Sequence, residues 1–256
     1  TNDRRQRQMC IRDRYNFFPN ETGGVIDDLI VYQLSPNDYM LVVNAANIEK
    51  DWKWIEHQKK GFDVQLEDLS DKTILLAVQG PKAIESLQSL TDVSLKEIAY
   101  YSHQQGTFAD CESVVIANTG YTGSGGVELY FDKKYASTIW NEILTIGAKP
   151  IGLAARDTLR LEMGYCLYGN ELNDNSSPIA AGLGWVTKPE TQCIGASILQ
   201  NQKENGTPQK LVGLQLLERG IPRSEYEDFD LTEKPIGKIT SGTQSPSLQC
   251  GIGLAY

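Results

Sequence analysis

Histidine is scarce in this chain of 256 residues: only His57 and His103 occur, far apart and without plausible partners. This excludes a catalytic triad built on histidine and a metal site built on several histidines. Five cysteines are scattered without a CxxC spacing, which excludes a zinc or redox motif of that kind. We interpret them as reduced thiols, expect no metal, and expect the chemistry to depend on carboxylates, arginines and other polar groups.

Positive charge and long apolar runs are also lacking. The chain has 24 Lys and Arg against 33 Asp and Glu, a formal net charge of −9. It has no overall positive field to attract phosphates or an anionic membrane, so we expect neither a nucleic-acid nor a membrane partner. No apolar run reaches the roughly 20 residues of a membrane-spanning helix, and no signal-peptide pattern opens the sequence. We therefore expect a cytoplasmic protein.

The two ends of the sequence differ from the rest. Residues 1–14 contain five arginines and almost nothing apolar, and the composition changes abruptly at Tyr15. A basic targeting or binding arm is one interpretation, and a non-native tail joined to a truncated reading frame is the one we favour, so we assign this segment no function. The sequence stops at Tyr256 inside an expected strand, which favours a truncated C-terminus as well.

Apolar runs and turn residues alternate along the rest of the chain, which predicts an α+β fold with a β-rich end. Residues 211–256 alternate short β-like runs with Gly, Pro and Ser turns, which is typical of part of a small β-barrel. The expected strands cover residues 25–34, 39–46, 73–78, 113–118 and 127–131; the expected helices cover residues 82–90, 133–146 and 152–164; a polar linker covers residues 188–210.

Two neighbouring carboxylates interrupt the apolar faces of the first expected strand. Because side chains alternate along a strand, Asp27 shares a face with Val25 and Leu29, while Asp28 shares the other face with Ile26 and Ile30. A carboxylate on an apolar face is costly without a partner, and such desolvation is one way in which proteins prepare an acid or base. The alternative is an edge-strand aspartate that stays in water.

A glycine-rich stretch, Gly120-Tyr121-Thr122-Gly123-Ser124-Gly125-Gly126, resembles a phosphate-binding loop at first sight. Such loops open a helix, whose amide groups hold the anion, whereas here an expected strand follows. We therefore predict a hairpin loop, and we single out Glu128, early in the following strand, as the residue of interest.

The expected helix over residues 152–164 carries two arginines one turn apart. Arg156 and Arg160 form a stripe beside an apolar stripe that we expect to be the core face, formed by Ala155, Leu159 and Met163. Two guanidinium groups at this spacing can address one ligand that bears a carboxylate. The alternative is a pair of ordinary ion pairs, with Asp157 and Glu162 as partners.

Several distinctive stretches occur in order along the chain: GGVIDDLIV (23–31), QGP (79–81), GYTG (120–123), GLAARDTLRLE (152–162), LYGNEL (167–172), GLGW (182–185), TSG (240–242) and SPSL (245–248). Taken together, they resemble the aminomethyltransferase (T-protein) family of the glycine cleavage system over Tyr15 to Tyr256. The resemblance implies a folate-binding core of interwoven ferredoxin-like lobes over residues 15–187, truncated at its start, the linker over 188–210, and an incomplete C-terminal β-barrel over 211–256.

The resemblance also implies an activity. The family takes the aminomethyl group carried on the lipoyl arm of H-protein, releases ammonia, and delivers the carbon to tetrahydrofolate as 5,10-methylenetetrahydrofolate. The expected partners are therefore lipoylated H-protein and folate, with tetrahydrofolate as co-substrate. The expected compartment is the cytoplasm, or the mitochondrial matrix in a eukaryote.

Five residues receive roles from this resemblance. The key aspartate of the family falls on Asp28, which would orient the reacting folate amine and stabilise positive charge as ammonia leaves. Glu128 would bind the pterin, Asn44 would line the same pocket, and Arg156 would hold folate from the helix. Arg223 matches an arginine placed near the site from the barrel.

Three other functions compete with this one. The folate domain of a sarcosine or dimethylglycine dehydrogenase shares the fold, but no flavin-type dinucleotide motif is visible. A noncatalytic folate-binding relative, of the kind that assists iron-sulfur protein maturation, would keep the pocket without receiving carbon from H-protein. A plain interaction module would carry its acidic pairs only as surface charge and would bind no folate.

Overall fold

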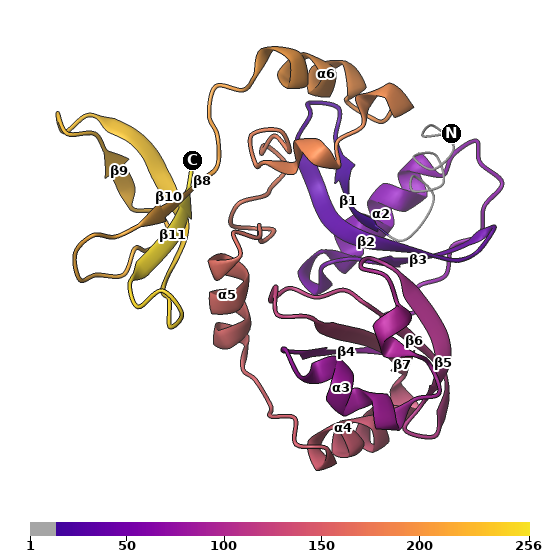
Figure 1. The fold of residues 1–256 in the computed structure, drawn as a ribbon. Helices are drawn as coiled ribbons and strands as arrows, with labels where there is room; N and C mark the ends of the chain where they lie inside the picture. Colours follow the sequence, from indigo (N-terminus) through magenta and orange to yellow (C-terminus); the bar gives the residue numbers. More distant parts are fainter. Residues whose placement is uncertain (1–13) are drawn as a thin grey trace, which may run out of the picture. The chain divides into compact units, whose positions relative to one another are not determined.

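The computed structural model describes residues 14–256, so the expected basic tail lies outside the described residues except for Arg14. The chain divides into two compact units. Over the described residues, the first contains Arg14, Val31–Leu41 and His57–Arg156, and the second contains Tyr15–Ile30, Val42–Glu56 and Asp157–Tyr256. Mixed helix and sheet occur in both units, which confirms the expected α+β class (Figure 1).

The first unit is built on a four-stranded antiparallel sheet with the order β4-β7-β6-β5. Its core contains Val127, Leu129 and Phe131, packed with residues of two helices, while Glu128 and Tyr130 alternate onto the opposite face. The helices therefore cover one face of this sheet and do not cover the opposite face, on which Glu128 lies. The elements are β4 (Thr73–Gln79), α3 (Ala83–Leu87), β5 (His103–Phe108), β6 (Cys111–Ala117), β7 (Gly126–Asp132) and α4 (Ala136–Thr145).

A long strand, β2 (Val25–Ser35), is the centre of a second sheet with the order β1-β2-β3. Its neighbours are β1 (Arg14–Pro19) and β3 (Asp38–Val42), and the helix α2 (Ile48–Gln58) follows. Residues 25, 27 and 29 are buried, but Tyr32 is the next buried position, so the buried face changes. The change falls where β2 passes from the second unit to the first, at Ile30–Val31.

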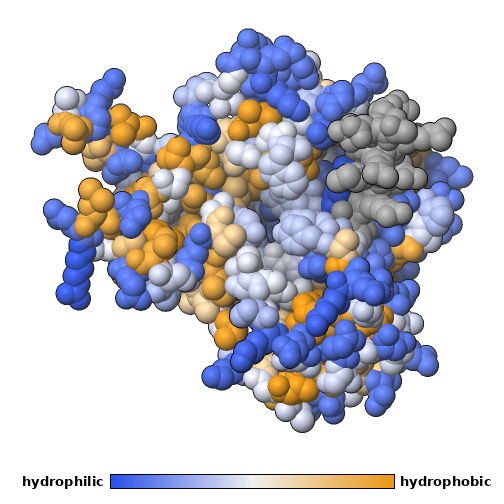
Figure 2. Space-filling model, viewed as in Figure 1, coloured by the Kyte–Doolittle hydropathy of each residue, from blue (hydrophilic) through white to orange (hydrophobic). Residues whose placement is uncertain are grey.

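The rest of the second unit consists of helices, turns and a C-terminal antiparallel sheet with the order β8-β11-β10-β9. Figure 2 shows apolar side chains at the surface of this part of the chain, at the left of the view. Leu217 and Leu231, in the connections between its strands, are fully exposed. The elements are α5 (Leu153–Glu162), α6 (Ala196–Asn205), β8 (Val212–Gln215), β9 (Glu227–Phe229), β10 (Pro235–Gln244) and β11 (Gly251–Ala255), and short 3-10 turns lie at Ala45–Asn47, Gln88–Leu90, Leu95–Glu97, Lys133–Tyr135, Leu183–Trp185 and Pro189–Thr191.

The glycine-rich stretch is a hairpin loop, as predicted, because β6 and β7 on its two sides pair antiparallel. Gly126 is needed at its end: its φ is +130°, and a Cβ there would lie 2.2 Å from the carbonyl oxygen of Val78. Gln79 secures the loop by donating to the carbonyl oxygens of Thr119 and Val127, each at 3.1 Å. The loop thus has a fixed attachment to the end of β4.

Two expectations about helices differ from the structure. The core face predicted for α5 is wrong: Ala155 and Met163 are exposed, and the buried residues are Arg160 and Leu161. A network around Arg160, described below, satisfies its charge and allows it to occupy the interior. The helices α2 and α6 were not expected, and α6 lies inside the segment expected to be a linker.

Candidate functional site

Asp27 lies on the central strand of its sheet and is fully buried, so the alternative of an edge-strand carboxylate in water is wrong for it. The turn after β3 supplies its donors. The backbone N of Asn44 donates to Oδ2 at 3.1 Å, and Asn44 Nδ2 and Asn47 Nδ2 donate to Oδ1 at 2.9 and 2.6 Å. These charge-assisted hydrogen bonds hold the turn against β2.

Asp28, the next residue, is only partly buried and is held by two donors. The Tyr15 hydroxyl on the adjacent strand β1 donates to Oδ2 at 3.0 Å, and Asn44 Nδ2 donates to Oδ1 at 3.0 Å. Burial raises the pKa of Asp28 to about 6; the Tyr15 hydrogen bond opposes this, and the negative charge of Asp27 adds to it. The carboxylate is thus oriented on both oxygens and is poised to exchange a proton near neutral pH.

Asn44 connects the two aspartates, because its single amide group donates to both carboxylates. Its backbone is extended, and its carbonyl oxygen accepts from Asn47 N at 2.8 Å, which closes the turn before α2. The next helix also contributes a cation: Lys50 Nζ donates to the carbonyl oxygen of Ile26 and to the Tyr168 hydroxyl. The site around Asp28 is therefore assembled from β1, β2, the 44–47 turn and α2.

Glu128 occupies a buried polar cluster in the first unit. Its Oε2 accepts from Thr119 Oγ1 at 2.5 Å and from the Tyr130 hydroxyl at 3.3 Å. The Tyr32 hydroxyl lies 2.9 Å from Thr119 Oγ1 and 3.2 Å from the Tyr130 hydroxyl, so three hydroxyl groups and one carboxylate form a single buried cluster. Burial and the nearby Glu128 charge raise the pKa of Tyr130, so this hydroxyl remains a donor. The cluster fixes a carboxylate on the sheet face away from the helices.

Arg156 and Arg160 do not form one cationic face, contrary to the expectation from their spacing. Arg156 is exposed, and its guanidinium lies 4.3 Å from the centre of the Tyr121 ring in the glycine-rich loop. Arg160 is fully buried. Of the two ion pairs weighed as the alternative, Arg160 does pair with Asp157, at 2.7 Å, whereas Glu162 accepts hydrogen bonds from Ser245 and Ser247 instead.

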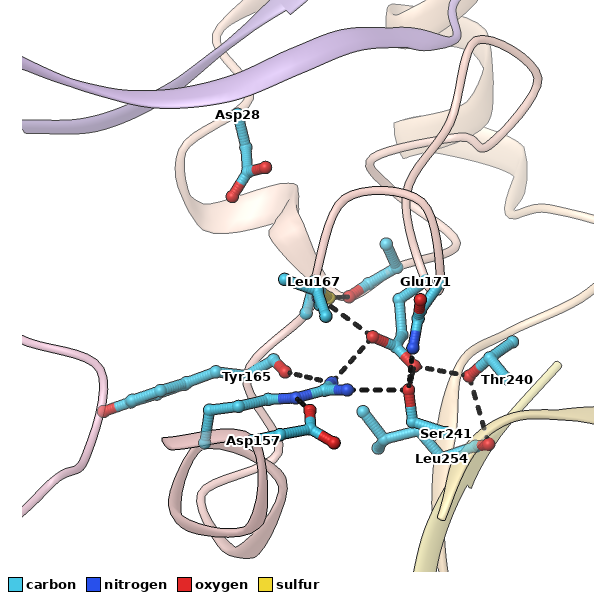
Figure 3. A network of polar contacts seen from close by, with 12 residues as sticks. Asp28, Asp157, Tyr165, Leu167, Glu171, Thr240, Ser241 and Leu254 are labelled. Atoms are coloured by element: carbon cyan, nitrogen blue, oxygen red, sulfur yellow. Dashed lines mark hydrogen bonds and ion pairs between the residues drawn. The ribbon is translucent and has the colours of Figure 1, made fainter. Parts of the chain in front are cut away.

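The Arg160 network joins α5, the following loop and β10 inside the second unit (Figure 3). Arg160 Nη1 donates to Glu171 Oε2 at 2.8 Å, and Arg160 Nη2 donates to Ser241 Oγ at 2.7 Å. Glu171 Oε1 accepts from Thr240 and Ser241, and Asp157 pairs with the Nε of Arg160. Figure 3 shows Asp28 to one side of this network, with none of the dashed contacts reaching it.

The residues singled out in the sequence are distributed over both units. Asp28 and Asn44 are hydrogen-bonded to each other in the second unit, which also contains the exposed Arg223. Glu128 and Arg156 belong to the first unit.

Sequence reasoning missed the side chains that support these residues. Tyr15 and Thr119 donate to Asp28 and Glu128 from other strands or loops, and no periodicity identifies such partners. His103 packs edge-on against Tyr32, with ring centres 5.4 Å apart.

Over residues 14–256, no group of three or more His, Cys, Asp and Glu side chains could hold a metal ion. None of the helices described is long and apolar enough to cross a membrane.

Comparison with known proteins points to one family. The family model described as the GCVT N-terminal domain matches residues 5–191, and that of the glycine cleavage T-protein C-terminal barrel domain matches residues 209–256. An aminomethyltransferase from Flavobacterium psychrophilum is 54% identical over 248 residues, which cover 95% of this chain and 68% of the relative. One from Bacteroides fragilis is 54% identical over 250 residues, with 95% and 69% covered.

A solved structure agrees with these matches. The crystal structure of the glycine cleavage system aminomethyltransferase T from Bartonella henselae superimposes with a TM-score of 0.86 at 33% identity, over 96% of this chain and 67% of that one.

Proposed function

The chain belongs to the glycine cleavage T-protein family, the aminomethyltransferases, and from this membership we propose the reaction that it carries out. The family predicted from the sequence motifs is confirmed, as is the fold of a GCVT domain followed by a barrel-type domain. The proposed reaction transfers the methylene carbon of the aminomethyl group on the lipoyl arm of H-protein to tetrahydrofolate. The products are 5,10-methylenetetrahydrofolate, ammonia and dihydrolipoyl H-protein, and the proposed compartment is the cytoplasm, or the mitochondrial matrix in a eukaryote.

The environment of Asp28 is the observation that carries this proposal. The transfer needs no nucleophile from the protein; it needs a group that orients the folate amine and stabilises positive charge while ammonia leaves. A carboxylate held on both oxygens, by Tyr15 and Asn44, has little freedom to reorient. Its pKa of about 6 leaves it ionised at neutral pH yet able to accept a proton from a bound amine.

Folate recognition is assigned to Glu128, Arg156, Arg223 and Asn44. A pterin presents a ring N–H and an exocyclic amino group side by side, which is a pair of donors suited to one carboxylate. Glu128 fits this role because it is buried and its orientation is fixed through Oε2 by Thr119 and Tyr130. Arg156 and Arg223 are exposed and supply positive charge for the anionic part of folate.

The experiment is a turnover assay on the full-length protein with aminomethylated H-protein and tetrahydrofolate. We expect release of ammonia and formation of 5,10-methylenetetrahydrofolate in equal amounts, both dependent on folate, with a reaction lacking tetrahydrofolate as the control. Saturable folate binding without turnover would favour a noncatalytic folate-binding relative. No saturable binding would leave only an interaction module and would reject the proposal.

A further inference from the structure

Asp51, on α2, is a buried carboxyl group to which the proposed reaction assigns no role. It lies in the first turn of α2 and is only 1% exposed. Among residues 14–256, no N–H or hydroxyl group donates a hydrogen bond to either of its carboxyl oxygens. A bare buried carboxylate is very costly, so the group must be neutral or must have another kind of partner.

That partner is Asp27. Burial raises the pKa of Asp51 to about 8, and the interaction of its side chain with that of Asp27 adds to this rise. Two ionised carboxylates cannot form a hydrogen bond, so one proton must lie between them. Both oxygens of Asp27 already accept hydrogen bonds, from Asn44 N, Asn44 Nδ2 and Asn47 Nδ2, whereas among residues 14–256 no N–H or hydroxyl group donates to Asp51. The proton therefore belongs on Asp51.

We propose that Asp51 is a positioning residue, whose carboxyl proton is donated to Asp27 so that Asp27 holds the Asn44 amide against Asp28. The chain of contacts runs from Asp51 to Asp27, from Asp27 to Asn44 Nδ2 at 2.9 Å, and from Asn44 Nδ2 to Asp28 Oδ1 at 3.0 Å. Asp51 does not touch substrate and acts only through this chain. The inference rests on the proposed role of Asp28.

The proton on Asp51 also limits the negative charge of the Asp27–Asp51 pair, which lies near Asp28. With Asp51 neutral, the pair presents one negative charge to Asp28 rather than two, and Asp28 can ionise near neutral pH. The titratable groups that face Asp51 are Asp27 and Asp28 on β2, Lys50 on its own helix, and Tyr168 in the loop after α5. Lys50 is engaged with Ile26 O and Tyr168, so it does not take the place of the proton.

Two substitutions of the full-length protein separate this role from simple packing. Asp51→Asn keeps a donor toward Asp27 without needing a proton from solution, so kcat at pH 7 should stay within about threefold of the native value. Asp51→Leu has a similar size but no donor, and it should lower kcat on the order of tenfold or more while KM for tetrahydrofolate changes little. A Leu variant as active as native, or an Asn variant as inactive as Leu, would overturn the proposal.

A thermal measurement keeps the inference testable if Asp51→Leu does not fold or if no turnover is found. In the native protein, the raised pKa of Asp51 means that stability falls as pH rises from its unfolded pKa toward its folded one. Asp51→Asn has no such dependence, so its Tm should exceed the native Tm at pH 7 and the gap should shrink toward pH 5. If the Tm difference between Asp51→Asn and the native protein does not change with pH, Asp51 is not protonated in the folded state and the inference is rejected. If the Tm difference changes with pH but no turnover is found, only the proposed reaction is rejected.

Discussion

The second unit contains two carboxylate environments that differ in how completely they are satisfied. Glu171 is fully buried, and both of its oxygens are occupied, by Arg160, Leu167 N, Thr240 and Ser241. Asp28 is partly accessible and has one side-chain donor for each oxygen. The first arrangement has no capacity left for a ligand, and the second does.

How completely a carboxylate is hydrogen-bonded and ion-paired distinguishes one that stabilises the fold from one that takes part in the reaction better than its burial alone does. The charge of Glu171 is balanced by Arg160, and the network joins α5 to β10. Among residues 14–256, no cation balances Asp28 in this way; its neighbours are a hydroxyl, an amide and the charge of Asp27, and burial raises its pKa to about 6. We therefore expect substitutions in the first environment to change stability and those in the second to change chemistry.

The strongest test of the comparison removes the cation of the satisfied network. Arg160→Leu leaves Glu171 buried and unpaired, so we expect a loss of about 3–5 kcal/mol in the free energy of unfolding. Arg156→Leu, one helical turn earlier but exposed, is the matched control and should change stability by less than about 0.5 kcal/mol. Chemical denaturation measures both. Equal stabilities for the two variants would mean that the network does not stabilise the second unit.

Glu128 extends the comparison to the first unit, because it is buried but has two hydroxyl donors rather than a cation. Glu128→Ala should weaken tetrahydrofolate binding by about 1–3 kcal/mol, since pterin donors would be left unpaired. Glu142→Ala, on the exposed side of α4, is the control. Calorimetric titration gives the dissociation constants, and an unchanged value for Glu128→Ala would remove Glu128 from the folate site.

The smallest expected effect comes from removing one hydrogen bond to Asp28 while keeping its carboxylate. Tyr15→Phe deletes a hydrogen bond that lowers the pKa of Asp28, so that pKa should rise above about 6 and the acid limb of kcat/KM should move to higher pH. At neutral pH we expect a loss of about 0.5–1.5 kcal/mol, a several-fold decrease in kcat/KM. Tyr226→Phe, at an exposed position, is the control; an unmoved acid limb would show that Tyr15 does not act on Asp28.

Local sequence pattern was sufficient to predict much of the fold, but it could not predict which side chains are the hydrogen-bond partners of the site residues. Alternation in β2 and the turn residues around β6 and β7 predicted these strands closely, because both are local signals. The spacing of α5 predicted the wrong core face, since only the distant Glu171 and Ser241 allow Arg160 to be buried. Asp28 and Glu128 could be singled out as carboxylates in apolar strands, but Tyr15, Thr119 and Asp51 become partners only through tertiary contacts.

Removing the charge of Asp28 tests the central claim most directly. Single-turnover rates with aminomethylated H-protein and saturating tetrahydrofolate would be compared for the native protein and Asp28→Asn between pH 5 and pH 8. The native rate should fall as pH drops through about 6, because Asp28 becomes protonated. Asp28→Asn should be slower by roughly 10²–10³-fold at pH 7.5 and lack that transition.

The stability of Asp28→Asn is the internal control for this measurement. Because the folded pKa of Asp28 is raised, native stability falls as pH rises from about 4 to about 6, and ionised Asp28 adds no stability above that range. Asp28→Asn should therefore have a Tm at pH 7.5 no lower than the native Tm. A folded Asp28→Asn variant that transfers the methylene group at the native rate would contradict the account.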